Sequence, residues 1–256
     1  MIKQNFCIDY IQSISIGKFL KILVTGARSL LGNILSQKIL ANNFELIASY
    51  RKNFPKNLNT HKVNLLKLDL KKKIKFSNKV DVLVHCASAI PAYKMTDKQM
   101  LDTNYLGFKR LLSEVVRNNC RKVILISSMS VYGKIKDKKV TEKTKTKPKD
   151  AYGKSKLMME KLLIRESKKK KLNFFILRLS ALVGYKSNYN FISEVLKKVK
   201  NNQIIRYRNP DLNFNNFIHV ENLSDIILKM ILRKENRILN IGSSKTMKLS
   251  KIINNI

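Results

Sequence analysis

The sequence of 256 residues predicts an α/β fold in which helices cover both faces of a parallel sheet. Short apolar, strand-like runs alternate along the chain with segments whose apolar residues recur at helical spacing. Strands that are separated by helices lie parallel and are joined by right-handed crossovers. The stretch LVTGARSLLG, residues 23–32, also reads as a strand, a glycine turn and the start of a helix. Together these observations indicate a Rossmann-like, doubly wound sheet.

Each element follows from its local pattern. The expected strands are 19–26 (FLKILVTG), 44–50 (FELIASY), 64–70 (NLLKLDL), 80–88 (VDVLVHCAS), 122–128 (KVILISS) and 173–184 (NFFILRLSALVG). The expected helices are 29–43, 101–119 and 151–171, the last with a lysine-rich final turn that suits the negative end of the helix dipole. Residues 134–150 are polar and form a loop. The pattern after Gly184 is less regular, which is consistent with a small C-terminal subdomain built on the sheet edge.

Composition and charge restrict the class of protein. The formal net charge is +35 and the pI is about 10.2, which suits an anionic partner such as nucleic acid. The lysines, however, are spread over almost every segment and accompany many Asn and Ile residues, so we favour coding bias over a nucleic-acid stripe. No apolar run approaches the roughly 20 residues that cross a bilayer. Cys7, Cys86 and Cys120 lack paired spacing. We therefore expect a cytoplasmic protein with no metal site, no membrane partner and no specific nucleic acid.

The glycine turn has the features of a dinucleotide-binding loop. Such a loop uses one glycine for the tight turn, a second for close approach to the phosphates and a third for helix packing. Gly26 and Gly32 occupy the outer positions, and Ser29 replaces the middle glycine. The Ser29 hydroxyl could itself donate to a phosphate. The helix that begins near Leu30 and Leu31 supplies free N–H groups and a partial positive charge.

Further motifs follow the glycine turn along the chain and form an ordered series with it. The segments SSMSVYG (127–133) and YGKSK (152–156) follow the loop in order, with HCAS, NYLG, LRLSALVG, FIHVENL and LNIGSS between or after them. From about Phe19 to the C-terminus the sequence resembles the extended short-chain dehydrogenase/reductase family, the branch of NAD(P)-dependent nucleotide-sugar epimerases, dehydratases and reductases. The resemblance implies a hydride-transfer enzyme that acts on a nucleotide-activated sugar.

The resemblance assigns the catalytic roles. Tyr152 and Lys156 are four residues apart and share one helix face. A phenol has an ordinary pKa of about 10, which a nearby ammonium and a cationic nicotinamide would lower. Tyr152 then exchanges a proton with the substrate, Ser128 hydrogen-bonds the reacting oxygen, and Lys156 also binds the nicotinamide ribose. Asn104 matches a family asparagine with a structural or proton-relay role.

The resemblance also implies which residues bind the cofactor. The expected contacts are Gly26, Ser29, Leu30, Leu31, Gly32, Arg51, Asp69, Leu70, Ala87, Tyr152 and Lys156. Asp69 would hydrogen-bond the adenine edge, although a strand-end turn explains its position equally well. At the end of the second strand Tyr50 stands where NAD-selective proteins carry an acid, and Arg51 and Lys52 follow. This favours NADP over NAD.

Departures from the family pattern narrow the substrate chemistry. Met129 and Ser130 stand where the dehydratases carry an acid pair, so dehydration is disfavoured and C4 epimerisation or keto-sugar reduction remains. Ser128, Arg178 and Asn215 are the expected substrate contacts, although Asn215 replaces the arginine that commonly grips the nucleotide diphosphate.

The resulting organisation has three parts. Residues 1–18 form an untargeted N-terminal extension, 19–184 the NAD(P)-binding Rossmann domain with the catalytic residues, and 185–256 a small substrate-binding region interleaved with the sheet edge, either minimal or truncated. The family's usual dimer pairs the two long helices. Two alternatives stay open: a non-catalytic Rossmann protein that binds an anionic partner, and a degenerate paralogue that binds cofactor without turnover.

Overall fold

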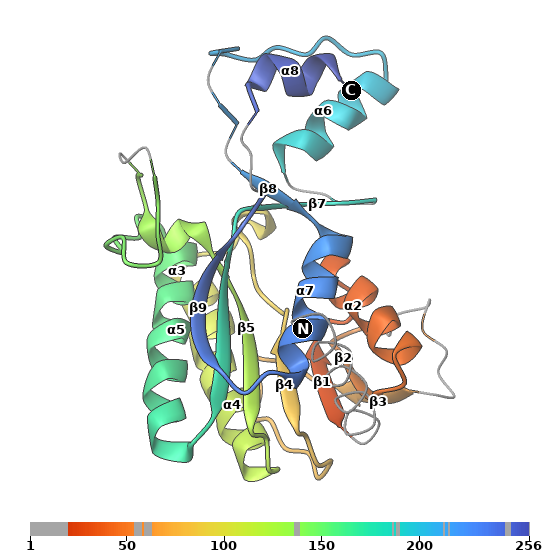
Figure 1. The fold of residues 1–256 in the computed structure, drawn as a ribbon, viewed down its shortest axis with the longest axis vertical. Coiled ribbons are helices and arrows are strands. Elements are labelled where there is room, and N and C mark those ends of the chain that lie inside the picture. The colour runs from red at the N-terminus through yellow and green to blue at the C-terminus, as the bar shows by residue number, and fades with distance from the viewer. Residues whose placement is uncertain are drawn as a thin grey trace, which may run out of the picture.

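A computed structural model describes residues 20–53, 58, 63–135, 139–185, 187, 190–211, 213–214, 216–243 and 247–255. The main sheet has seven strands, all parallel, in the order β3-β2-β1-β4-β5-β6-β9 (Figure 1). The strands are β1 (Lys21–Thr25), β2 (Glu45–Tyr50), β3 (Val63–Lys67), β4 (Val82–His85), β5 (Lys122–Ser128), β6 (Asn173–Leu179) and β9 (Asn236–Ile241). This order confirms the predicted fold class.

Helices cover both faces of the sheet (Figure 1). One face packs against α2 (Leu30–Ala41) and α7 (Val220–Leu232), and the other against α4 (Gly107–Arg117) and α5 (Ala151–Lys170). Successive strand residues point to opposite faces, so β1 sends Ile22 and Val24 toward α2 and Leu23 toward α4 and α5. Burial of both faces explains why the strands read as nearly continuous apolar runs.

The strand order reverses between β1 and β4, and this reversal positions the site. From β1 the chain moves outward through β2 and β3, then returns to place β4 on the other side of β1. Connections that leave the carboxyl ends of β1 and β4 therefore diverge and open a crevice. The predicted nucleotide-binding residues from Gly26 to Ala87 all follow β1, β2, β3 or β4, at this edge of the sheet.

A second, two-stranded sheet begins the C-terminal lobe. Strand β7 (Ala181–Val183) pairs in parallel with β8 (Phe217–His219), and α6 (Phe191–Lys200) and α8 (Leu249–Asn254) lie beyond them (Figure 1). The single strand expected over 173–184 is wrong, because the chain changes sheets at Ser180. Its N–H donates to the carbonyl of Ile241 at the end of β9, whereas the next N–H, of Ala181, donates to Asn216.

The remaining expectations about organisation are not decided by this architecture. The N-terminal extension lies outside the described residues. The domain boundary near residue 184 stays a prediction, and α7 and β9 return from beyond it to the main sheet. Among the helices that the structure describes, none is both long and apolar enough to span a bilayer.

Candidate active site

The turn after β1 is built for close backbone contact. Gly26 has a φ of +68°, a left-handed conformation that side chains disfavour. A Cβ on Gly26 would lie 2.9 Å from Ala87 Cα, beyond the end of β4. A Cβ on Gly32 would lie 2.2 Å from the Gly26 carbonyl oxygen. Both glycines are therefore required for the turn to bring the start of α2 against β1 and β4.

Ser29 is the N-cap of α2. Its φ of −68° and ψ of 161° are ordinary for any residue, so the position does not require glycine. The Ser29 hydroxyl accepts a hydrogen bond of 3.1 Å from the Gly32 N–H. The first backbone bond of the helix runs from Asn33 to the Ser29 carbonyl, which leaves the N–H groups of Leu30 and Leu31 ahead of it. The substitution thus preserves an N-terminus suited to a phosphate, and the turn fits a dinucleotide.

The structure brings Ser128, Tyr152 and Lys156 together. Ser128 ends β5, and its hydroxyl interacts with the Tyr152 side chain, whose pKa it lowers. The Ser128 hydroxyl also donates to Ser130 Oγ at 3.1 Å. Lys156 lies one turn further along α5, with Nζ 5.6 Å from the centre of the Tyr152 ring. The Lys156 Nζ donates to the Ile126 carbonyl of β5 at 2.8 Å. Helix and strand therefore converge on one point at the carboxyl edge of the sheet.

Burial controls ionisation at this point. It raises the pKa of Tyr152 to about 12, an effect that the Ser128 hydrogen bond opposes and the Asp150 carboxylate adds to. It lowers the pKa of Lys156 to about 8, against the Glu160 carboxylate and Cys86. The expected lowering of the phenol pKa is therefore not a property of the protein alone, because burial is the largest influence on it and the opposing effect comes from Ser128.

Asn104 joins the loop after β4 to α5. It lies in a π-helical turn (Asp102–Leu106) between α3 (Asp97–Leu101) and α4, and its side chain is 1% exposed. The amide oxygen accepts from the Ala89 N–H at 2.7 Å, and the amide nitrogen donates to the Ala89 carbonyl and to Ser155 Oγ, both at 3.0 Å. Ser155 in turn donates to the Tyr152 carbonyl. These contacts support the structural one of its two predicted roles.

The other cofactor candidates follow neighbouring strands. Arg51 is exposed directly after β2. Asp69 accepts from the Lys71 N–H at 3.0 Å, which is the strand-end turn considered above. Leu70 is buried against the start of α4. A Cβ on Gly107 would lie 2.7 Å from the Cβ of Leu70. Their contacts with a cofactor stay predictions.

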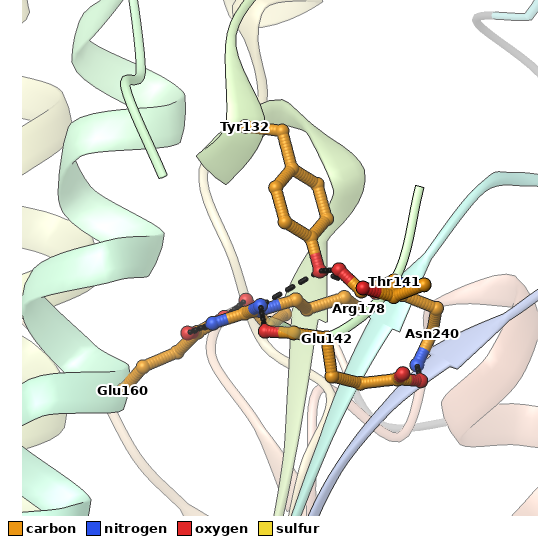
Figure 2. A network of polar contacts seen from close by, with 7 residues as sticks. Tyr132, Thr141, Glu142, Glu160, Arg178 and Asn240 are labelled. Carbon is orange, nitrogen blue, oxygen red and sulfur yellow. Dashed lines mark hydrogen bonds and ion pairs between the residues drawn. The ribbon is translucent and has the colours of Figure 1, made fainter. Parts of the chain in front are cut away.

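Arg178, a predicted substrate contact, lies inside the protein (Figure 2). Its guanidinium pairs with Glu160 at 2.7 Å and donates to the Tyr132 hydroxyl at 2.7 Å. Both members of the ion pair are buried, Arg178 being 4% exposed and Glu160 1%. Asn215, the other predicted contact besides Ser128, lies outside the described residues. The substrate-binding roles of all three stay predictions.

Sequence reasoning missed Glu160 and His85. Glu160 extends the spacing of Tyr152 and Lys156 by four more residues on the same face of α5, which is the signal that could have found it. His85 ends β4, and its Nδ1 lies 2.8 Å from Thr25 Oγ1 at the end of β1. Burial lowers the His85 pKa to about 3, so this imidazole is neutral.

One protein family matches most of this sequence. The model of the NAD dependent epimerase/dehydratase family matches residues 22–242. UDP-glucose 4-epimerase 2 of Oryza sativa subsp. japonica is 31% identical over 147 residues, which cover 55% of this chain and 35% of that protein. The match thus spans about a third of that relative's length.

Two solved structures share the fold. UDP-glucose 4-epimerase of Thermotoga maritima with UDP-glucose has a TM-score of 0.82 at 18% identity, covering 92% of this chain and 81% of that one. UDP-glucose 4-epimerase of Thermus thermophilus in complex with NAD has a TM-score of 0.77 at 17% identity, with the same coverage. The family match over most of the sequence, on a Rossmann-like sheet with the expected turn, shows that this chain belongs to the NAD-dependent epimerase/dehydratase family.

Proposed function

We propose that this protein is an NAD(P)-dependent enzyme that epimerises or reduces a nucleotide-activated sugar, with a UDP-sugar C4 epimerase as the leading form. The observation that carries the proposal is the convergence of Ser128, Tyr152 and Lys156 at the carboxyl edge of the sheet, the edge that also carries the turn at Gly26. The names of the relatives support a UDP-sugar substrate. The family supports a nicotinamide dinucleotide, and the Gly26–Gly32 turn fits its pyrophosphate.

The side chains divide the proton chemistry. Tyr152 accepts the proton of the sugar hydroxyl and returns it later, as a general acid–base. Ser128, whose hydroxyl interacts with the phenol, holds the reacting oxygen at the same point. Lys156 stabilises the phenolate by its charge and holds the cofactor ribose. When bound, the nicotinamide supplies reversible hydride acceptance.

The replacement of Tyr152 by Phe tests this assignment. We expect Tyr152→Phe to lower kcat for interconversion of UDP-glucose and UDP-galactose by about 10²–10⁴-fold, the usual range for loss of a general acid–base. Nucleotide-sugar chromatography measures the turnover. The matched control is Tyr105→Phe, a tyrosine packed against the core beside α4. Full activity of Tyr152→Phe would contradict the proposal.

The preference for NADP is a separate proposal. The end of β2 offers Arg51 and Lys52 and has Tyr50 in place of an acid, which suits a 2′-phosphate. We expect Arg51→Asp to weaken NADPH binding and strengthen NADH binding, each by about tenfold, since a bidentate phosphate contact is lost and a ribose acceptor gained. Fluorescence titration measures both. Lys169→Asp, an exposed change of equal charge on α5, controls for net charge, and equal shifts in both variants would contradict the preference.

A further inference from the structure

A buried polar network joins α5 to the sheet (Figure 2). Helix α5 also carries Tyr152 and Lys156. Its centre is the ion pair of Glu160 on α5 with Arg178 on β6. The Arg178 Nε donates to both carboxylate oxygens, at 3.1 and 3.2 Å, and Nη2 donates to one of them at 2.7 Å. Such a forked contact fixes the relative orientation of its two partners.

The network is attached at both ends to residues beside the catalytic set. Ser127, which precedes Ser128 on β5, donates from its hydroxyl to the Glu160 carboxylate. Glu160 itself follows Lys156 by one turn of α5. Strand β5 thus carries Ser127 beside Ser128, and helix α5 carries Glu160 one turn from Lys156. The hydrogen bond between Ser127 and Glu160 joins the strand directly to the helix.

A third branch reaches the loop that leads into α5. Tyr132 accepts from Arg178 Nη1 at 2.7 Å, and its hydroxyl also lies 2.8 Å from Asn240 Oδ1 of β9 and 3.1 Å from the Thr141 carbonyl. Glu142, the next residue of the loop, accepts from the Asn240 N–H at 2.7 Å. The same loop ends at Asp150, which caps α5 two residues before Tyr152.

The energetics of such a network favour a role in geometry. Desolvation offsets much of the attraction in a buried ion pair, so apolar residues of similar volume often replace one without loss of stability. What they cannot replace is direction, because a forked contact and a shared hydroxyl fix angles as well as distances. The three tyrosine contacts likewise define where the end of β5, the loop and β9 meet.

We infer that Glu160, Arg178 and Tyr132 are positioning residues that hold α5 in register with β5, and so hold the Tyr152 hydroxyl against Ser128. The part of this inference that concerns catalysis rests on the proposed function. It gives Arg178 a role inside the protein as the alternative to the predicted substrate contact. A displacement of about 1 Å at a reacting group can cost about 100-fold in rate, so small shifts of α5 matter.

The test uses one mild variant, one double variant and a control. Tyr132→Phe removes only the hydroxyl that joins Arg178 to the loop and to β9. Glu160→Leu with Arg178→Met keeps buried volume and removes the directional contacts. The control, Lys122→Met, removes a buried cation outside the network. Lys122 begins β5, at the end of the strand away from Ser128, and its Nζ donates to the Ile231 carbonyl.

Three measurements are made on each full-length variant. They are kcat and KM for the UDP-sugar, the thermal unfolding midpoint, and the 13Cζ tyrosine NMR signal of Tyr152, assigned by its loss in Tyr152→Phe. We expect Tyr132→Phe and the double variant to lower kcat by about 10- to 100-fold with KM nearly unchanged. We expect the Tyr152 signal to move or broaden in both and to stay in place in Lys122→Met.

The outcomes separate this inference from the proposed function. If the wild type turns over no UDP-sugar, the proposed function fails, and the Tyr152 signal alone decides the inference. If the double variant does not fold, Tyr132→Phe decides it. An unmoved Tyr152 signal with wild-type kcat in the folded variants overturns the inference, as does an equal effect in Lys122→Met.

Discussion

Burial shifts the pKa of several groups at the carboxyl edge of the sheet, each in the direction that favours the neutral form of the group. Tyr152 is raised to about 12, Lys156 is lowered to about 8 and His85 to about 3. An apolar surrounding disfavours whichever form of a group is charged, so the phenol keeps its proton while the amine and the imidazole lose theirs more readily. The site is therefore poorly suited to isolated charge and well suited to charges that arrive in pairs.

Lys156 should make stability rise with pH. Its pKa is about 8 in the fold and 10.5 in a model peptide, so the unfolded chain holds more protons between these values. The free energy of unfolding should therefore rise from pH 8 to 10.5 relative to Lys156→Met, and differ little with pH below 8. Urea titrations at pH 7 and 10 measure it. Lys154→Met, on an exposed position of the same helix, should show no such pH-dependent difference; a flat comparison for Lys156→Met would contradict the prediction.

At this scale, spacing along a helix carried most of what could be predicted. Tyr152 and Lys156 share a face because they are four residues apart, and the structure places them so. The partner of Glu160 is Arg178, which comes from a strand 18 residues later. Contacts of this kind depend on how helix and strand pack, which no local pattern contains.

The start of α2 shows how one element tolerates a changed residue. Ser29 accepts from the Gly32 N–H as an N-cap, and its backbone angles suit any residue. We expect Ser29→Ala to lower the free energy of unfolding by about 1 kcal/mol, and Ser29→Gly by only a few tenths, as at other N-caps. Urea denaturation measures both. Equal losses in the two variants would show that the hydroxyl does not cap the helix.

Helices and strands were predicted well where one continuous hydrophobic pattern coincides with one element. Strands β1, β2, β4 and β5 and helices α2 and α5 were each predicted correctly as one element. The segment 173–184 was not, because its apolar pattern is continuous while its hydrogen-bond partners change from β9 to Asn216 at Ser180. Pairing partners decide where such a strand ends, and they lie about 60 and 35 residues further along the chain.

At the scale of the whole molecule, the main feature is the formal net charge of +35. If the charge reflects coding bias, binding to arbitrary duplex DNA should occur in low salt and disappear by about 200 mM, because it depends on counterion release alone. Fluorescence anisotropy with a labelled duplex measures this. Binding that persists above that salt concentration would favour the nucleic-acid alternative. Tight NADPH binding without turnover would favour the degenerate paralogue.

The capped start of α2 also bears on how quickly this protein can capture its ligand. The turn is fixed by its own serine, by a left-handed glycine and by contact with Ala87, so it is ordered before any anion arrives. A preorganised site loses little conformational entropy on association. Encounter with an anion is then set by diffusion and by long-range attraction to a cationic surface. Differences in affinity among dinucleotides should therefore appear in how long each stays bound.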